Sequence, residues 1–80
     1  MPQHYTRIRD LREDNDLTQK QVAEHLFLQL TQYRRYETGE REAPAHIIKQ
    51  LAYFYNVSAD YILGITNEPN PLPAKNKKRP

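Results

Sequence analysis

Hydrophobic positions along the chain recur in short blocks, at the three-to-four-residue spacing of amphipathic helices. The first block covers about residues 5–14, where Ile8 and Leu11 fall on one face. Asn15 and Asp16 follow it, and both residue types tolerate the left-handed conformation in which many helices end. The pattern therefore predicts a first helix that stops just before these two residues.

A second helix is marked at its start by Thr18 and Gln21, which have the spacing of a capping box. In that motif the threonine oxygen accepts a backbone N–H, and the glutamine side chain reaches back to the N–H of the threonine. We expect this helix to bury Val22, Ala23 and Leu26, which lie on one face.

A corner at residues 27–29 separates the second helix from a third, about residues 30–38. Tyr33 and Tyr36 are expected to point inward, so the polar and basic side chains between them point outward. Gly39 suits the end of this helix. Two short helices joined by a tight corner are typical of a helix-turn-helix, whose second helix can lie in the major groove of DNA.

Two further helices are expected in the second half of the chain. Pro44 favours a helix start, because its fixed φ and missing N–H are tolerated in a first turn. This fourth helix ends at Asn56, and a short fifth runs from the cap Ser58 through Leu63 to Gly64. The apolar stripe of the fourth helix comprises Ile48, Leu51, Ala52 and Tyr55, flanked by Ile47 and Phe54.

The chain is therefore expected to be all-α, with a compact five-helix bundle over residues 1–66 and no strand. Residues 67–80 are rich in proline and basic residues and are predicted to form a flexible, disordered tail. Eighty residues allow one small domain. A core of that size is marginal, which favours a dimer or a bound partner.

The total charge of the chain is weak evidence for a nucleic-acid partner. The formal net charge is +2, but four of the 12 basic residues lie at positions 75–79. The rest of the chain has eight basic against 10 acidic residues, so the positions of the charges, not their total, must decide whether a nucleic acid is a partner.

Several classes of function find no support in the sequence. There is no cysteine, and His4, His25 and His46 are far apart in sequence, so neither a disulfide nor a metal site is expected. No apolar run approaches the roughly 20 residues of a membrane span, and no signal-peptide pattern is present. We expect a cytoplasmic protein, associated with the nucleoid when bound to DNA. No arrangement of catalytic residues is visible, so an enzyme, a cofactor and a small-molecule ligand are not expected.

Six short motifs stand in a fixed order over about residues 5–65: Arg7-Ile-Arg-Asp-Leu-Arg12, Leu17-Thr-Gln19, Val22-Ala23-x-x-Leu26, Tyr33-x-x-Tyr36-Glu37-x-Gly39, Leu51-Ala52 and Val57-Ser-x-Asp-Tyr61-x-Leu-Gly64. Together they resemble the lambda-repressor and Cro-type helix-turn-helix family of phage and bacterial transcription regulators. The resemblance implies sequence-specific binding of double-stranded DNA, usually by a homodimer on a pseudo-palindromic operator with half-sites roughly 34 Å apart. It also implies a repressor more often than an activator.

The resemblance also assigns residues to the DNA. Those matching the base-facing positions are Gln29, Leu30, Thr31 and Arg35, those at the groove walls are Gln32 and Arg34, and those at the backbone are Gln19 and Arg41. Arg35 can bond guanine O6 and N7, a contact worth about 1–3 kcal/mol of discrimination. The alternative for both arginines of the third helix is an ordinary solvated helix face. Leu30 either meets a thymine methyl or, as we favour, covers the corner.

Two residues depart from the family pattern at the corner. Phe27 stands where the family usually has glycine, and positive φ is unfavourable for a bulky side chain. Either the corner is reshaped, or Phe27 gains enough by packing to offset the strain. Gln29 stands where the family favours serine or threonine, and it caps a helix poorly, so the third helix is expected to start loosely and to order on DNA.

Other polar and aromatic residues have competing interpretations. The resemblance implies a partly buried ion pair between Arg12 and Glu37. Tyr33 and Tyr36 are more consistent with core packing, with their hydroxyls at the surface, than with stacking on single-stranded nucleic acid. The basic positions 75–79 either hold DNA phosphates or, as we favour, form a solubilising end.

Dimer contacts are expected in the fourth and fifth helices, around Tyr53, Tyr55 and Tyr61. One alternative function keeps the DNA-binding head in an antitoxin or in the controller protein of a restriction–modification system. Another alternative is a module that binds a protein partner. Acidic residues near the proposed DNA face support this alternative: Glu24, Glu40 and Glu42.

Overall fold

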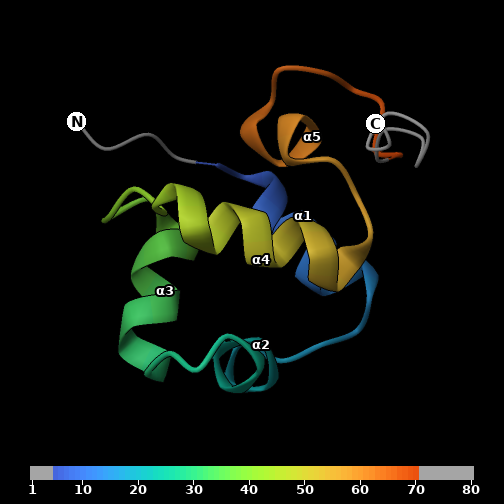
Figure 1. Ribbon diagram of the computed structural model, residues 1–80. Helices are drawn as coiled ribbons and strands as arrows, with labels where there is room; N and C mark the ends of the chain where they lie inside the picture. Colours follow the sequence, from blue (N-terminus) through green and yellow to red (C-terminus); the bar gives the residue numbers. More distant parts are fainter. Residues whose placement is uncertain (1–4, 71–80) are drawn as a thin grey trace, which may run out of the picture.

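The structure, a computed structural model, describes residues 5–70 of the chain. It contains five helices and no strand within those residues (Figure 1): α1 (Arg7–Asp14), α2 (Gln19–His25), α3 (Leu30–Thr38), α4 (Ala45–Tyr55) and α5 (Ala59–Leu63). The prediction of an all-α bundle of five helices is confirmed. Positions 71–80, and with them most of the predicted tail, lie outside the described residues.

α1 contacts both α3 and α5 and so connects the two halves of the bundle (Figure 1). α2 packs on α3, and α4 packs on α5, so the helix-turn-helix pair lies toward one end of the molecule and α5 toward the other. All five helices contribute to the core, whose largest fully buried side chains are Ile8, Val22, Tyr33, Ile47, Leu51 and Ile62.

The buried face of α4 is rotated from the one that the sequence predicts. Ile47, expected only to flank the stripe, is 2% exposed, whereas Ala52 and Tyr55 are half-buried. The buried positions of this helix are Ile47, Ile48 and Leu51; the second and third follow Ile47 by one and four positions, so all three lie on one side.

The helix boundaries follow local chemistry that the sequence predicts well. Thr18 Oγ1 accepts the N–H of Gln21 at 3.0 Å, and Gln21 Oε1 accepts the N–H of Thr18 at 2.8 Å, which confirms the capping box. Ser58 Oγ accepts the N–H of Tyr61 at 3.0 Å and starts α5. Asn56 ends α4 with a φ of 56°, the left-handed conformation that asparagine tolerates.

The backbone after α5 returns to the helices. The guanidinium of Arg7 lies over the ring of Tyr61, 4.1 Å from its centroid, and donates to the carbonyls of Tyr61 and Thr66. The N–H of Ser58 donates to the carbonyl of Pro69 at 2.8 Å. These contacts hold the residues that follow Ile65 against α1 and the start of α5. The domain boundary at residue 66 stays a prediction.

Candidate nucleic-acid interface

The corner between α2 and α3 turns on Phe27, whose φ is 59°. The N–H of Phe27 donates to Glu24 at 3.1 Å and that of Leu28 donates to Ala23 at 2.9 Å, so the end of α2 is closed by backbone hydrogen bonds. The side chain of Phe27 is 93% exposed. The alternative that packing offsets the strain at this position is therefore wrong, because the ring has almost no contact with the fold.

The start of α3 has no side-chain cap. Gln29 occupies the cap position with φ −72° and ψ 148°, and its side chain makes no capping hydrogen bond. This agrees with the expectation that glutamine caps poorly. Leu30, the first residue of the helix, is half-buried against the core, which favours its role in covering the corner.

The inward face of α3 is fixed by Tyr33, Tyr36 and Glu37, which are 0%, 9% and 4% exposed. The expectation that both tyrosine hydroxyls reach the surface is wrong for Tyr33. Its hydroxyl donates to Glu37 Oε2 at 2.6 Å inside the protein, because the ring is too deep to reach water. The hydroxyl of Tyr36 accepts from Gln32 Nε2 at 3.1 Å.

Glu37 accepts hydrogen bonds from three elements. Arg12 Nε and Nη2 reach its two carboxylate oxygens at 2.7 and 3.1 Å, which confirms the ion pair between α1 and α3. Gln19 Nε2 donates to Glu37 Oε1 at 2.9 Å. Burial alone would raise the pKa of Glu37, but the hydrogen bonds from Arg12, Tyr33 and Gln19 outweigh it and lower that pKa.

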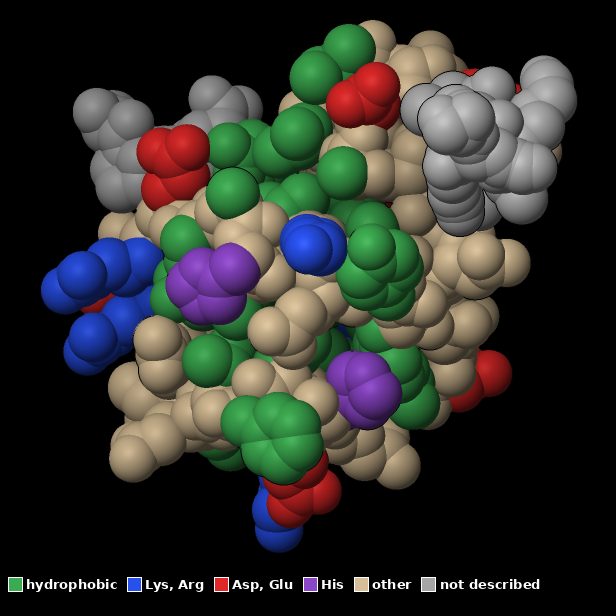
Figure 2. Space-filling model, viewed as in Figure 1, with side chains coloured by type: hydrophobic (Ala, Val, Ile, Leu, Met, Phe, Trp, Pro, Cys, Tyr) green, Lys and Arg blue, Asp and Glu red, His purple; other side chains and the backbone are tan. Residues whose placement is uncertain are grey.

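The outward face of α3 carries five exposed polar or charged side chains: Thr31, Gln32, Arg34, Arg35 and Thr38. A shallow groove of about 340 Å³ lies beside this face, lined by Gln29, Thr31, Gln32, Arg35, Tyr36 and Arg41. The structure therefore brings together five of the eight residues predicted to meet DNA. Figure 2 shows Lys and Arg side chains gathered at the left edge of the molecule, over α3.

Two other predicted residues pair with each other on the α2 side of this face. Arg34 Nε donates to Gln19 Oε1 at 3.1 Å, while the amide nitrogen of Gln19 is held by Glu37. Gln19 thus connects the buried carboxylate to an exposed arginine of α3. The family resemblance assigns Gln19 to a DNA phosphate, and no sequence pattern indicates this bridge, because Gln19 and Arg34 are 15 positions apart.

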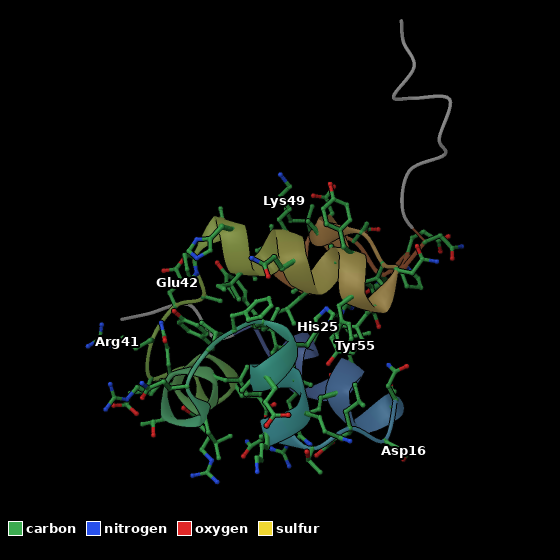
Figure 3. The ribbon with its side chains drawn as sticks, turned by 60° about the horizontal axis from the view of Figure 1, so that its bottom comes forward. Asp16, His25, Arg41, Glu42, Lys49 and Tyr55 are labelled. Atoms are coloured by element: carbon green, nitrogen blue, oxygen red, sulfur yellow. The ribbon has the colours of Figure 1, made fainter. Side chains whose placement is uncertain are left out.

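The loop after α3 folds back on the helix end. The N–H of Arg41 donates to the carbonyl of Arg35 at 3.1 Å, and the side chain of Arg41 points away from the body (Figure 3). Glu40 Oε2 lies 3.7 Å from Arg35 Nε, and Glu42 accepts from the hydroxyl of Tyr5 at 3.0 Å. The Arg35–Glu40 pair spans Gly39, outside any helical spacing, so no sequence pattern indicated it.

The remaining titratable residues in the part of the chain that the structure describes indicate no second site. His25 is exposed and its ring stacks on Phe54, with centroids 3.9 Å apart; it lies where α2 meets α4 (Figure 3). Within residues 5–70, no three histidine or acidic side chains are grouped as metal ligands would be. None of the helices described here combines the length and the apolar character that a membrane span requires.

A tight corner between two packed helices, the second with a buried aromatic face and an exposed polar face, defines the helix-turn-helix class. The chain belongs to the helix-turn-helix domain family, whose model matches residues 5–68.

Two curated relatives come from Bacillus subtilis (strain 168). An uncharacterised HTH-type transcriptional regulator, YobD, is 40% identical over 65 residues, which is 81% of this chain and 58% of YobD. The HTH-type transcriptional regulator ImmR is 34% identical over 58 residues, which is 72% of this chain and 46% of ImmR. The chain thus spans about half the length of these relatives. The search of solved structures found no match.

Proposed function

We propose that the protein binds double-stranded DNA in a sequence-specific manner and regulates transcription, with α3 in the major groove. The observation that carries this proposal is the two-faced α3: Tyr33, Tyr36 and Glu37 anchor one side, which leaves Arg34 and Arg35 exposed on the other. A helix held in this way presents its outer side chains to a groove without rearrangement of the core. The names of both relatives, HTH-type transcriptional regulators, support the regulatory role.

In this proposal Arg35 reads a guanine through O6 and N7, and Gln29 and Thr31 face neighbouring bases. Arg34, Gln32 and Arg41 contact phosphates. Gln19 contributes by holding Arg34 as well as by meeting a phosphate. The groove beside α3 is lined by residues of both groups, Gln29, Thr31 and Arg35 as well as Gln32 and Arg41, and so supports their action on one face.

The finer features of the proposal are a homodimer, a pseudo-palindromic operator and a repressor role. A symmetric dimer places two copies of α3 about one helical turn of DNA apart. Tyr53, 75% exposed on α4, and Ile65, 71% exposed just after α5, are apolar side chains available for self-association. Tyr61 is less available than the sequence suggested, because Arg7 covers its ring.

Selection of bound sequences from random DNA tests the function directly. We expect a pseudo-palindromic consensus, and binding to it should weaken steeply as salt rises, since each phosphate neutralised adds about 0.9 to the log–log slope. Recovery of no consensus, together with no binding to random duplex at low salt, would refute DNA binding.

Arg35→Ala separates DNA reading from stability. We expect the variant to lose discrimination at one base pair by about 1–3 kcal/mol while its melting temperature stays close to wild type, because the side chain is exposed. Arg12→Ala is the matched contrast. It should lower the free energy of unfolding by about 3–5 kcal/mol, because it leaves the buried Glu37 without its cation. The reverse pattern in competition binding and thermal melts would overturn this division.

One observation favours a second candidate, a module that binds a protein partner. Phe27 exposes 93% of its side chain at the corner, where it adds nothing to the core. Exposed aromatic residues are frequent anchors of protein interfaces. Phe27→Ala should abolish partner binding if this candidate is correct and leave operator binding intact if α3 reads DNA.

A further inference from the structure

We infer that the hydroxyl of Tyr36 donates a hydrogen bond to a backbone phosphate of the DNA, together with the amide of Gln32 beside it. This inference rests on the proposed DNA-binding function and adds a contact from a residue whose ring belongs to the core. Packing accounts for the ring of Tyr36 and leaves its hydroxyl without a role.

The hydroxyl of Tyr36 is held in place by the core. The side chain is on the inward face of α3 and is 9% exposed, so close packing keeps the ring from swinging. Tyr36 also lines the shallow groove beside α3, and its hydroxyl accepts from the exposed Gln32 at 3.1 Å. The buried ring therefore presents its hydroxyl to the groove at one fixed place.

The contact with Gln32 uses the hydroxyl of Tyr36 as an acceptor and leaves its proton available. A phenol can donate and accept at the same time, and no acceptor within residues 5–70 takes this proton. Gln32 Nε2 has a second N–H as well. Two donors 3.1 Å apart thus stand at the groove, and binding of DNA requires no bond between them to break.

The surroundings of this pair favour an anion. Arg35 and Arg41 both line the groove, while the carboxylate of Glu40, 3.7 Å from Arg35 Nε, offsets only part of their charge. Phosphate oxygens are anionic, and hydrogen bonds to them are stronger than those between neutral groups.

The depth of Tyr36 favours a phosphate over a base edge. A ring that is 9% exposed ends at the protein surface, so its hydroxyl cannot extend into a DNA groove as an arginine can. The phosphates and sugars form the outside of the duplex and receive most of the hydrogen bonds that proteins make to DNA. The contact would therefore position α3 without reading a base.

Tyr36→Phe tests the inference, with binding measured on the selected duplex and on a random duplex. We expect the variant to bind both about tenfold more weakly, because a phosphate contact carries no sequence information. The salt slope should stay unchanged, since no cation is removed. The melting temperature should stay close to wild type, because phenylalanine keeps the buried ring.

Tyr61→Phe is the matched control. It removes the same hydroxyl from α5, toward the other end of the molecule, and keeps the ring that Arg7 covers. It should bind both duplexes as the wild type does. Unchanged binding by Tyr36→Phe would overturn the inference. A loss confined to the selected duplex would also overturn it, because the hydroxyl would then act on a base.

Duplexes with single phosphates replaced by uncharged methylphosphonates identify the acceptor. At one position in each half-site, the replacement should weaken the wild type about tenfold more than it weakens Tyr36→Phe. Equal penalties for both proteins at every position would refute a contact between this hydroxyl and a phosphate.

A second cycle separates a direct contact from an effect through Gln32. In a Gln32→Ala background, Tyr36→Phe should still weaken binding several-fold, because the hydroxyl itself donates to the phosphate. Complete loss of the effect would overturn the inference, since Tyr36 would then only orient Gln32. Failure of the wild-type protein to bind any duplex would instead refute the proposed function, so the two failures are distinguishable.

Discussion

Glu37 is buried with three donors around it, and within residues 5–70 it is the only charged residue buried to this degree. Arg12, Tyr33 and Gln19 satisfy its two oxygens from α1, α3 itself and the start of α2. A charge placed in this way stabilises only while all its partners remain, because a buried carboxylate without them is costly. The same carboxylate therefore fixes the relative positions of three helices.

The lowered pKa of Glu37 predicts a loss of stability in acid. A carboxyl whose pKa is lower in the folded than in the unfolded state stabilises the fold above its ordinary pKa of 4.5, and this contribution is lost as pH falls through the folded value. The free energy of unfolding should thus fall below about pH 4.5. Glu37→Gln should be less stable at pH 7 and should show a flatter acid limb in urea titrations. Glu24→Gln, an exposed control, should keep the wild-type profile.

Tyr33 and Tyr55 should respond oppositely to loss of the hydroxyl. Tyr33→Phe removes a hydrogen bond to a buried carboxylate and should cost about 1.5–3 kcal/mol. The buried hydroxyl of Tyr55 has no hydrogen-bond partner among the described residues, so Tyr55→Phe should raise stability by about 1 kcal/mol. Chemical denaturation of both variants measures the difference. A destabilised Tyr55→Phe would reveal a partner for that hydroxyl, such as a buried water.

Tyr55 also has a consequence in alkali. Burial raises the pKa of Tyr55 to about 12, so the folded protein keeps a proton that the unfolded chain loses near its ordinary pKa of 10.0. The contribution is present below pH 10.0 and is lost as pH rises toward about 12. Tyr55→Phe should therefore lessen the loss of stability in this range.

At the level of the helices, the corner between α2 and α3 combines two locally unfavourable features. Phe27 combines a left-handed backbone with an exposed ring, and α3 begins without a cap. Phe27→Gly should raise the free energy of unfolding by about 0.5–1 kcal/mol, since relief of about 1–2 kcal/mol of strain exceeds the entropy cost of glycine. Thermal melts measure the gain.

Phe27→Ala is the control for this substitution. Alanine keeps the left-handed strain and removes only an exposed ring, so its stability should stay within about 0.5 kcal/mol of the wild type. If glycine and alanine destabilise equally, Phe27 makes a stabilising contact that its exposure does not suggest.

The sequence predicts the helices well because their ends depend on local chemistry. Thr18, Ser58 and Asn56 act through neighbours within four residues, so a single sequence contains the required information. The rotation of the α4 face toward Ile47 could not be predicted in this way. It depends on how α5 packs against α4, which no local spacing specifies.

The whole molecule offers one clear test of self-association. Tyr53→Asp places a charge on an exposed apolar position of α4 and should weaken the dimer by about tenfold or more, as measured by sedimentation equilibrium without DNA. Phe27→Asp is the matched control, since it changes an exposed aromatic side chain at the corner between α2 and α3. Equal weakening by both variants, or a wild-type monomer at high concentration, would contradict the proposed α4–α5 interface.

The candidate site could be predicted only in part, because some of its contacts join residues that are distant in sequence. The face of α3 follows from the inward positions of Tyr33 and Tyr36, so Arg34 and Arg35 could be assigned to the outside. The partners of those arginines could not be, because they come from the start of α2 and from the loop after Gly39. These contacts form only when the fold brings distant segments together.

Arg7 ties the two ends of the described chain to each other. Its guanidinium binds Tyr61, Thr66 and Asn67, which lie 54 to 60 positions away along the sequence. A local opening of residues 66–70 would break the hydrogen bonds of this arginine to Thr66 and Asn67, leave only its contacts to Tyr61, and so loosen α1 at the same time. Amide hydrogen exchange in α1 thus reports on whether residues 66–70 stay folded against the bundle. Removal of residues 66–70 should speed that exchange, although the two segments are far apart in sequence.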